Sequence, residues 1–320
     1  MSCNENQWKY WLCLLSSVLL LPGCQSAGDS AKDSGKPVIA LIMKSLANEF
    51  FLTMEQGAKE HQQKNAGDYT LITNGIKDEL DVSRQVDLVE QMIAQRVNAI
   101  VIAPADSKAL VAVCKKSQEA GIVVINIDNK FDAGVLTAQN VKIPFIGPDN
   151  RKGAQLAGEQ LVKKLKAGDK VAIVEGVPSA FNAQQRKLGF EDALKAGKLT
   201  IANSQSAGWE MSKANQVVSA MIAEQPDLKA ICCANDSMAL GAVAALKEAG
   251  KTDQVLVIGF DNISAVQQLV KEGKVLATVD QHGDQLAVFG IEYALEILRK
   301  KATPADQETP VDLITADKLK

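Results

Sequence analysis

Short apolar runs rich in β-branched residues alternate with longer amphipathic segments from Val38 onward. The longer segments, such as 82–95 and 108–120, repeat their apolar positions at the spacing of a helix. The short runs predict ten strands: Val38–Met43, Tyr69–Thr73, Ala99–Ala103, Ile122–Ile127, Phe145–Gly147, Val171–Glu175, Thr200–Ser204, Ala230–Ala234, Val255–Phe260 and Leu276–Val279.

This strict alternation predicts an α/β fold, in which parallel sheets carry helices on both faces. Ten strands with their helices exceed the size of one doubly wound domain, so we expect two similar lobes. Because no Gly/Ser-rich linker interrupts this region, the chain is expected to cross between the lobes at strand ends.

The first 24 residues have a different pattern. Lys9 precedes an apolar stretch, 11–21, which is shorter than the roughly 20 residues of a membrane-spanning helix and is typical of a signal-peptide core. The ending Leu21-Pro22-Gly23-Cys24 resembles a bacterial lipoprotein cleavage box, with Cys24 as the lipidated residue, although Pro22 departs from the usual pattern. Residues 25–36 are small and polar, which predicts a flexible tether.

Four of the predicted strands end in a pair of Asp and Asn residues. The pairs are Asp128-Asn129, Asp149-Asn150, Asn235-Asp236 and Asp261-Asn262. In an open parallel sheet the ligand crevice lies at the carboxyl ends of the strands, and Asp and Asn can accept or donate hydrogen bonds to hydroxyl groups. Any single pair is explained as well by capping of the next helix, but four pairs together favour a polar binding site.

Composition narrows the possible functions. The formal net charge is −3 with no long run of one sign, so no nucleic-acid surface is expected. The two histidines, His61 and His282, are too few for a multi-histidine metal site, and no Gly-x-Ser-x-Gly or Walker motif is present. These observations predict binding without catalysis, cofactor or metal. Cys114 and the adjacent Cys232 and Cys233 are expected to be buried and structural.

Aromatic residues make up only 4% of the chain, so their positions are informative. Phe50 and Phe51 follow the first strand and Trp209 follows the strand at 200–204, each near a carboxyl end. They would pack on the C–H faces of a sugar, or simply in the core. Lys44 and Arg186 occupy similar positions, either as ligand contacts or as solvated side chains.

Together, several segments resemble the periplasmic sugar-binding proteins of ABC transporters, in particular the ribose- and allose-binding group. The resemblance extends from about Pro37 to the C-terminus and rests on residues 45–51, 127–128, 186–190, 234–241, 257–261 and 277–281. It implies the type 1 periplasmic binding protein fold, with two doubly wound parallel-sheet lobes joined by a multi-strand hinge. It also implies an N-terminal lobe of residues 37–148 plus 282–310 and a C-terminal lobe of 149–281 plus 311–320.

The resemblance also implies a sugar site, with three aromatic rings around the sugar and polar side chains on its hydroxyls. The candidate ligand-binding residues are Lys44, Asn48, Phe50, Phe51, Asp128, Asn129, Asn182, Arg186, Trp209, Asn235, Asp261 and Gln281. Asp149 and Asp236 are expected outside this set, as capping or hinge residues. Lys44 and Asn129 depart from the ribose-binding pattern, so an allose- or psicose-like sugar is favoured over ribose.

The implied function is that of the substrate-binding component of an ABC sugar importer. Such a protein closes on a monosaccharide at its hinge and delivers it to a membrane permease. We expect a monomer, exported to the periplasm or cell surface and anchored through lipid at Cys24. Two alternatives stay open: a sugar-sensing receptor for chemotaxis or a sensor kinase, and an exported α/β enzyme.

Overall fold

The structure is a computed structural model that describes residues 35–319, and contacts join Lys36–Lys320 into one compact unit. The predicted signal segment 1–24, with Cys24, lies outside the described residues, as does nearly all of the predicted tether.

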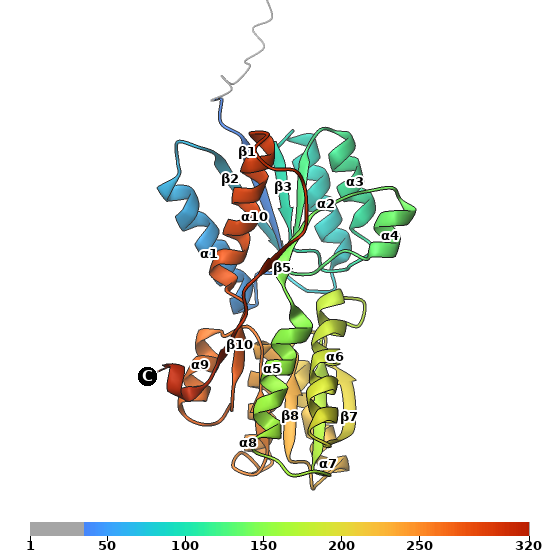
Figure 1. Cartoon of the computed structure of the whole chain (residues 1–320), viewed down its shortest axis with the longest axis vertical. Helices are drawn as coiled ribbons and strands as arrows, with labels where there is room; N and C mark the ends of the chain where they lie inside the picture. The colour runs from blue at the N-terminus through green and yellow to red at the C-terminus, as the bar shows by residue number, and fades with distance from the viewer. Residues whose placement is uncertain (1–34, 320) are drawn as a thin grey trace, which may run out of the picture. The chain divides into compact units, whose positions relative to one another are not determined.

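The first lobe is built on a six-stranded parallel sheet in the order β11-β5-β4-β3-β1-β2. Helices α1 (Glu49–Lys64) and α10 (Gly283–Leu298) pack together on one face, and α2 (Val82–Ala94) and α3 (Val111–Glu119) on the other (Figure 1). A short helix, α4 (Ala133–Ala138), follows β4. The strands are β1 (Val38–Ser45), β2 (Thr70–Ile76), β3 (Ala99–Ile102), β4 (Val123–Ile127), β5 (Phe145–Pro148) and β11 (Gln307–Thr309).

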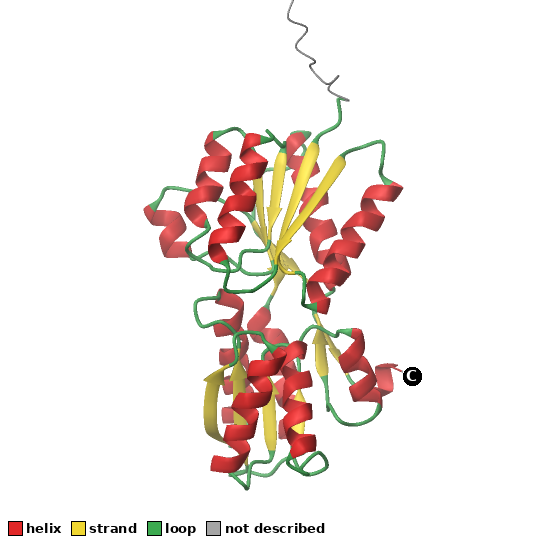
Figure 2. Cartoon of the chain, turned by 180° about the vertical axis from the view of Figure 1, so that it is seen from behind, coloured by secondary structure: helices red, strands yellow, loops and turns green. Residues whose placement is uncertain are grey.

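The second lobe is built on a four-stranded parallel sheet in the order β7-β6-β8-β9. Helices α5 (Asn150–Val162) and α6 (Phe181–Ala196) cover one face, and α7 (Met211–Glu224) and α8 (Asp236–Glu248) cover the other, as the two opposite views show (Figures 1 and 2). The remaining elements are β6 (Lys170–Glu175), β7 (Thr200–Ser206), β8 (Ala230–Cys233), β9 (Leu256–Ile258), α9 (Ser264–Lys271), the antiparallel pair β10 (Thr278–Asp280) and β12 (Asp312–Ile314), and a final 3₁₀ turn, Ala316–Leu319.

The chain passes between the lobes at three points. It leaves the first lobe between β5 and α5, returns between β10 and α10, and leaves again between β11 and β12 (Figure 1). This is the multi-strand connection expected from the absence of a linker. Both sheets present the carboxyl ends of their strands toward this junction, which places the loops that follow the strands where the two lobes meet.

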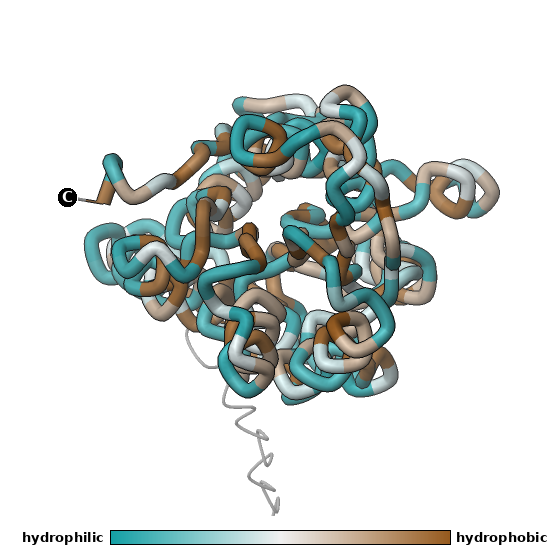
Figure 3. The backbone as a smooth tube through the Cα atoms, turned by 90° about the horizontal axis from the view of Figure 1, so that it is seen from below, coloured by the Kyte–Doolittle hydropathy of each residue, from teal (hydrophilic) through white to brown (hydrophobic). Residues whose placement is uncertain are grey.

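Side chains along each strand alternate between the two faces of the sheet, and this explains why helices cover both faces. In β1, Ile39 and Leu41 belong to the core beside α1 and α10, whereas Ala40 and Ile42 belong to the core beside α2 and α3. Both sides of the strand are therefore apolar. In the helices, by contrast, hydrophilic and hydrophobic positions alternate around the turns (Figure 3).

All ten predicted strands are present, with ends that differ by up to three residues. The strand β11 was not predicted because its sequence, Gln307-Glu308-Thr309, is polar and too short to show a period. Its backbone pairing with β5 determines it. Cys114, Cys232 and Cys233 are buried, as expected, and their thiols are free.

Candidate ligand-binding site

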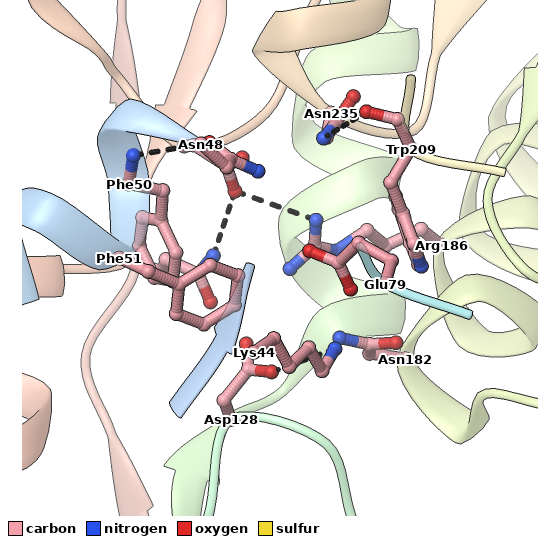
Figure 4. Close-up of a pocket in the computed structure, with 12 residues that line it drawn as sticks. Lys44, Asn48, Phe50, Phe51, Glu79, Asp128, Asn182, Arg186, Trp209 and Asn235 are labelled. Carbon is pink, nitrogen blue, oxygen red and sulfur yellow. Dashed lines mark hydrogen bonds and ion pairs between the residues drawn. The ribbon is translucent and has the colours of Figure 1, made fainter. Parts of the chain in front are cut away.

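A cavity of about 250 Å³ lies at the junction of the lobes. Its wall combines two cationic side chains, three carboxyl groups, four amides and three aromatic rings (Figure 4). The lining residues are Lys44, Asn48, Phe50, Phe51, Glu79, Asp128, Asn182, Arg186, Trp209, Asn235, Asp261 and Gln281. Nine of these twelve side chains are charged or amides, so the cavity suits a small polar molecule.

Eleven of the twelve sequence-predicted residues line this cavity, and Asn129 does not. The Asn129 side chain is fully buried beside it, where Oδ1 accepts a hydrogen bond from the Asn182 backbone N–H at 3.2 Å. Its Nδ2 donates to the Pro104 carbonyl at 2.9 Å. The structure therefore places Asn129 in a contact between the lobes, a role that depends on tertiary packing and has no local sequence signal.

Phe50, Phe51 and Trp209 supply the aromatic part of the wall. Asn48 begins α1 by accepting the Phe50 N–H at 3.1 Å, which turns both phenylalanines toward the junction. Their rings meet edge to face with centroids 5.1 Å apart. Trp209 comes from the loop before α7, and its ring lies where a Cβ on Gly176 would approach to 2.2 Å. Residue 176 must therefore be glycine for Trp209 to occupy this position.

One buried ion pair comes from the first lobe. Lys44 Nζ, at the end of β1, lies 2.9 Å from Asp128 Oδ2, just after β4, and both side chains are at most 3% exposed. The ammonium group also lies 5.8 Å from the centroid of the Phe51 ring and 5.7 Å from that of Trp209. These are favourable distances for cation–π attraction.

A second buried ion pair comes from the second lobe. Arg186 Nη1 lies 3.4 Å from Asp261 Oδ1, and it donates to the Ala234 carbonyl at 2.8 Å. Arg186 Nε donates to Asn150 Oδ1 at 2.8 Å, and the guanidinium stacks 3.7 Å from the centroid of the Phe260 ring. Burial lowers the pKa of Arg186, while the nearby aspartates oppose that shift.

Asp261 is held by more than the arginine. Gln281 Nε2 donates to Asp261 Oδ1 at 2.7 Å. Burial raises the pKa of Asp261, and the positive charge of Arg186 opposes that rise. Its neighbour Asp236 points away from the cavity, accepts hydrogen bonds from Thr278 and Ile263, and has a pKa raised to about 7 by burial. Asp149 caps α5, so both residues lie outside the cavity wall, where they were expected.

Unused hydrogen-bonding capacity remains in the wall. Within residues 35–319, Asn182 Oδ1, Gln281 Oε1 and Trp209 Nε1 are buried without a hydrogen-bond partner. Buried polar atoms are ordinarily paired, so two free acceptors and one free donor indicate a site that a polar ligand completes.

The backbone is also strained at this site. Asp128, Trp209 and Asp261 have φ values of 61°, 73° and 126°, in a region that residues other than glycine rarely adopt. Such conformations persist where the surrounding structure holds them, and they concentrate at functional sites. Here the strain turns two carboxylates and an indole toward the same cavity.

Sequence reasoning missed one lining residue, Glu79. It lies in the loop between β2 and α2 and is 4% exposed. Burial, with help from Asp128 and Glu210 and against the effect of Lys44, raises its pKa to about 7. The available signal was its position after a strand, but that strand ends without an Asp/Asn pair.

Contacts between the lobes surround the cavity. Ser107 Oγ accepts the Phe181 N–H at 2.9 Å, next to the Asn129–Asn182 contact, at the start of α6. On the other side, Glu49 accepts hydrogen bonds from the backbone N–H and hydroxyl of Ser264, where α9 begins. Neither α6 nor α9 is capped by the side chain of its own N-cap residue. The first lobe thus caps two helices of the second.

A family model described as "Periplasmic binding protein domain" matches residues 39–302. The chain belongs to this family. It is 54% identical over 310 residues to a D-ribose/D-allose-binding protein of Pseudomonas aeruginosa, covering 94% of this chain and 97% of that one. It is 32% identical to the ribose import binding protein of Escherichia coli, covering 94% and 96%.

Solved structures of this family have a similar fold. A solute-binding protein of an ABC transporter from Actinobacillus succinogenes, with bound D-allose, superposes with a TM-score of 0.85 at 36% identity, covering 89% of this chain and 99% of that one. Another solute-binding protein of an ABC transporter, from Burkholderia multivorans, superposes with a TM-score of 0.86 at 57% identity, covering 88% of this chain and 100% of that one. As in this periplasmic binding protein family, the fold is the type 1 arrangement of two lobes.

Within residues 35–319, no group of three or more His, Cys, Asp or Glu side chains is arranged to hold a metal ion. In the same range, none of the helices combines the length and apolar character that a bilayer crossing requires.

Proposed function

We propose that this protein is the substrate-binding component of an ABC sugar importer, which closes on one monosaccharide and delivers it to a membrane permease. The observation that carries the proposal is the cavity at the lobe junction, whose wall combines aromatic rings with paired charges and free amide oxygens. Rings pack on the C–H faces of a sugar, while amides and carboxylates bind its hydroxyls.

The proposed ligand is an allose-, psicose- or ribose-like monosaccharide. The identity to a D-ribose/D-allose-binding protein and the likeness to a protein with bound D-allose support this class. In the proposed site, Phe50, Phe51 and Trp209 enclose the ring. The polar contacts come from Lys44, Asn48, Asp128, Asn182, Arg186, Asn235, Asp261 and Gln281.

The proposal also covers the movement of the lobes and the location of the protein. Residues 37–148 plus 282–310 and residues 149–281 plus 311–320 act as two lobes that rotate about their three connections. We propose a monomer, exported and held at a bacterial membrane by lipid on Cys24. Replacement Cys24→Ser tests the anchor: the protein is expected to leave the membrane fraction, and unchanged membrane association would contradict it.

A thermal-shift screen tests the binding function. A ligand that binds only the folded state stabilises it by about 2.7 kcal/mol when present at 100 times its dissociation constant. We therefore expect D-allose, D-psicose or D-ribose to raise the melting temperature by several degrees. The proposal fails if none of a panel of pentoses, hexoses and ketoses raises it, and if Asp128→Ala and Asp261→Ala behave like the wild type. Turnover of a bound sugar would indicate an enzyme instead.

A further inference from the structure

Glu79 occupies a loop that the structure holds firmly. The Lys77 carbonyl accepts a hydrogen bond from Ser45 Oγ at 2.7 Å, and Asp78 Oδ1 accepts the Leu80 N–H at 2.8 Å. Asp81 then caps α2 by accepting the Arg84 N–H at 3.0 Å. With anchors on both sides, the Glu79 side chain is directed into the junction of the lobes, where it lines the cavity (Figure 4).

The charges in the cavity wall leave Glu79 as the carboxyl group without an ion pair. Lys44 is paired with Asp128 at 2.9 Å and Arg186 with Asp261 at 3.4 Å. Glu79 forms no ion pair in the described part of the chain, and the Ser45 backbone N–H donates a hydrogen bond to its carboxyl group. A buried carboxyl group with so few partners is costly unless a ligand supplies more.

The position of Glu79 also indicates which part of a ligand it meets. Asn48, Glu79 and Trp209 line both the inner cavity and a separate outer pocket of about 860 Å³. These three residues form the partition between the two spaces. A ligand in the inner cavity therefore presents its outward edge to Glu79, on the side where Lys44 lies.

We propose that Glu79 is a specificity-determining residue, which forms a hydrogen bond with one hydroxyl on the outward edge of the bound sugar. This inference rests on the proposed sugar-binding function. An epimer that turns this hydroxyl away leaves a buried carboxyl group unpaired, which weakens binding on the order of 10- to 100-fold. Glu79 thus discriminates between sugars that the paired aspartates bind equally well.

The test is isothermal titration of the full chain with D-allose, D-ribose and monodeoxy analogues of D-allose, with one hydroxyl removed at a time. Glu79→Ala is expected to weaken binding of the preferred parent sugar on the order of 10- to 100-fold. It should weaken binding of one monodeoxy analogue by less than about threefold, because that analogue lacks the partner hydroxyl. Glu79→Met, which has a similar length but no strong hydrogen-bonding group, carries the same comparison if Glu79→Ala fails to fold.

Ser212→Ala serves as the control, because Ser212 lines the outer pocket but not the inner cavity and carries no charge that acts on Glu79. We expect its affinity to remain within about twofold of the wild type. Equal weakening of the parent sugar and of every analogue by Glu79→Ala, or no weakening at all, overturns the inference while leaving sugar binding intact. Absence of binding by the wild type to all of these sugars overturns the proposed function and this inference with it.

Discussion

The two buried ion pairs of the cavity have the same charges but different surroundings. Arg186 and Asp261 belong to a network in which Asn150, the Ala234 carbonyl and Gln281 supply further hydrogen bonds, and the Phe260 ring packs on the guanidinium. Lys44 and Asp128 have each other, two aromatic rings at longer distance and the carboxyl group of Glu79 nearby.

This difference separates a fixed half of the site, around Arg186 and Asp261, from an adjustable half, around Lys44 and Asp128. A guanidinium held by several acceptors and a ring has one geometry, so it defines the cavity before a ligand arrives. An ammonium on a flexible stem, with one paired carboxylate and a second carboxyl group nearby, can rearrange its hydrogen bonds at small cost. We therefore expect the second lobe to fix the position of the sugar, and the first lobe to adapt to its hydroxyl pattern.

The largest effect should come from Arg186→Met, which keeps the volume and removes the guanidinium. It leaves Asp261 as an uncompensated buried charge and Asn150 without its donor, so unfolding should become easier by about 3–5 kcal/mol. Chemical denaturation measures this, and sugar binding should fall at least 100-fold. The control is Arg151→Met, whose 2.6 Å pair with Asp192 is exposed and should matter little. Equal losses in both variants would contradict the role of the network.

Lys44→Met tests the Lys44–Asp128 pair in the same way. It removes the other buried cation, but Glu79 already has a pKa of about 7 and can take up a proton to relieve the repulsion from Asp128. The loss of stability should therefore be smaller, about 2 kcal/mol. Adding Glu79→Gln should recover part of it. A loss as large as that of Arg186→Met would show that the two pairs are equally fixed.

Prediction from sequence was most successful where one local rule decides the position of a residue. Asp128, Asn235 and Asp261 each follow an apolar strand, and parallel topology brings such positions together. Asp236 shows the limit of that rule, because it is adjacent to Asn235 but points toward Thr278 and Ile263. Neighbouring residues at the end of a strand face opposite ways, and only the packing decides which of them meets the ligand.

Two assignments depended on contacts between distant segments. Asn129 was expected on the ligand, but its position is determined by Pro104 and by the start of α6. Glu79 reaches the cavity because Ser45 and Asp78 hold its loop. Neither arrangement leaves a periodic or spaced pattern in the sequence, so neither was predictable from local rules.

The pH dependence of stability directly tests the first-lobe part of the site, which contains Lys44, Asp128 and Glu79. Because the pKa of Glu79 rises from 4.5 to about 7 on folding, the folded state binds more protons, and its stability should decrease as pH rises from about 5 to 8. The decrease attributable to Glu79 is on the order of 2 kcal/mol. Glu79→Gln should lack this part, while the contribution of Asp236 is common to both proteins and cancels. A constant difference between wild type and variant across this range would contradict the shift.

A smaller effect is expected from Gly176→Ala, which acts on an aromatic wall rather than on a charge. The added Cβ would lie 2.2 Å from the Trp209 ring, so the indole must move. We expect sugar affinity to fall about tenfold, measured by calorimetry, since a displaced ring loses part of its stacking contact. Gly67→Ala is the control, because an added Cβ there meets nothing within 4 Å. Unchanged affinity would show that Trp209 does not contact the sugar.

The smallest effect should come from the contacts that close the site, since they touch no ligand. Glu49 caps α9 across the junction only when the lobes are together, so Glu49→Ala should destabilise the closed form relative to the open form and leave each lobe intact. A cap contributes about 1 kcal/mol, which predicts a sugar affinity reduced about fivefold and a melting temperature without sugar that changes little. Glu60→Ala, farther along the same helix, is the control, with an expected change within twofold. If Glu49→Ala lowers the melting temperature of the sugar-free protein as much as it lowers affinity, the contact stabilises the open form equally and does not favour closure.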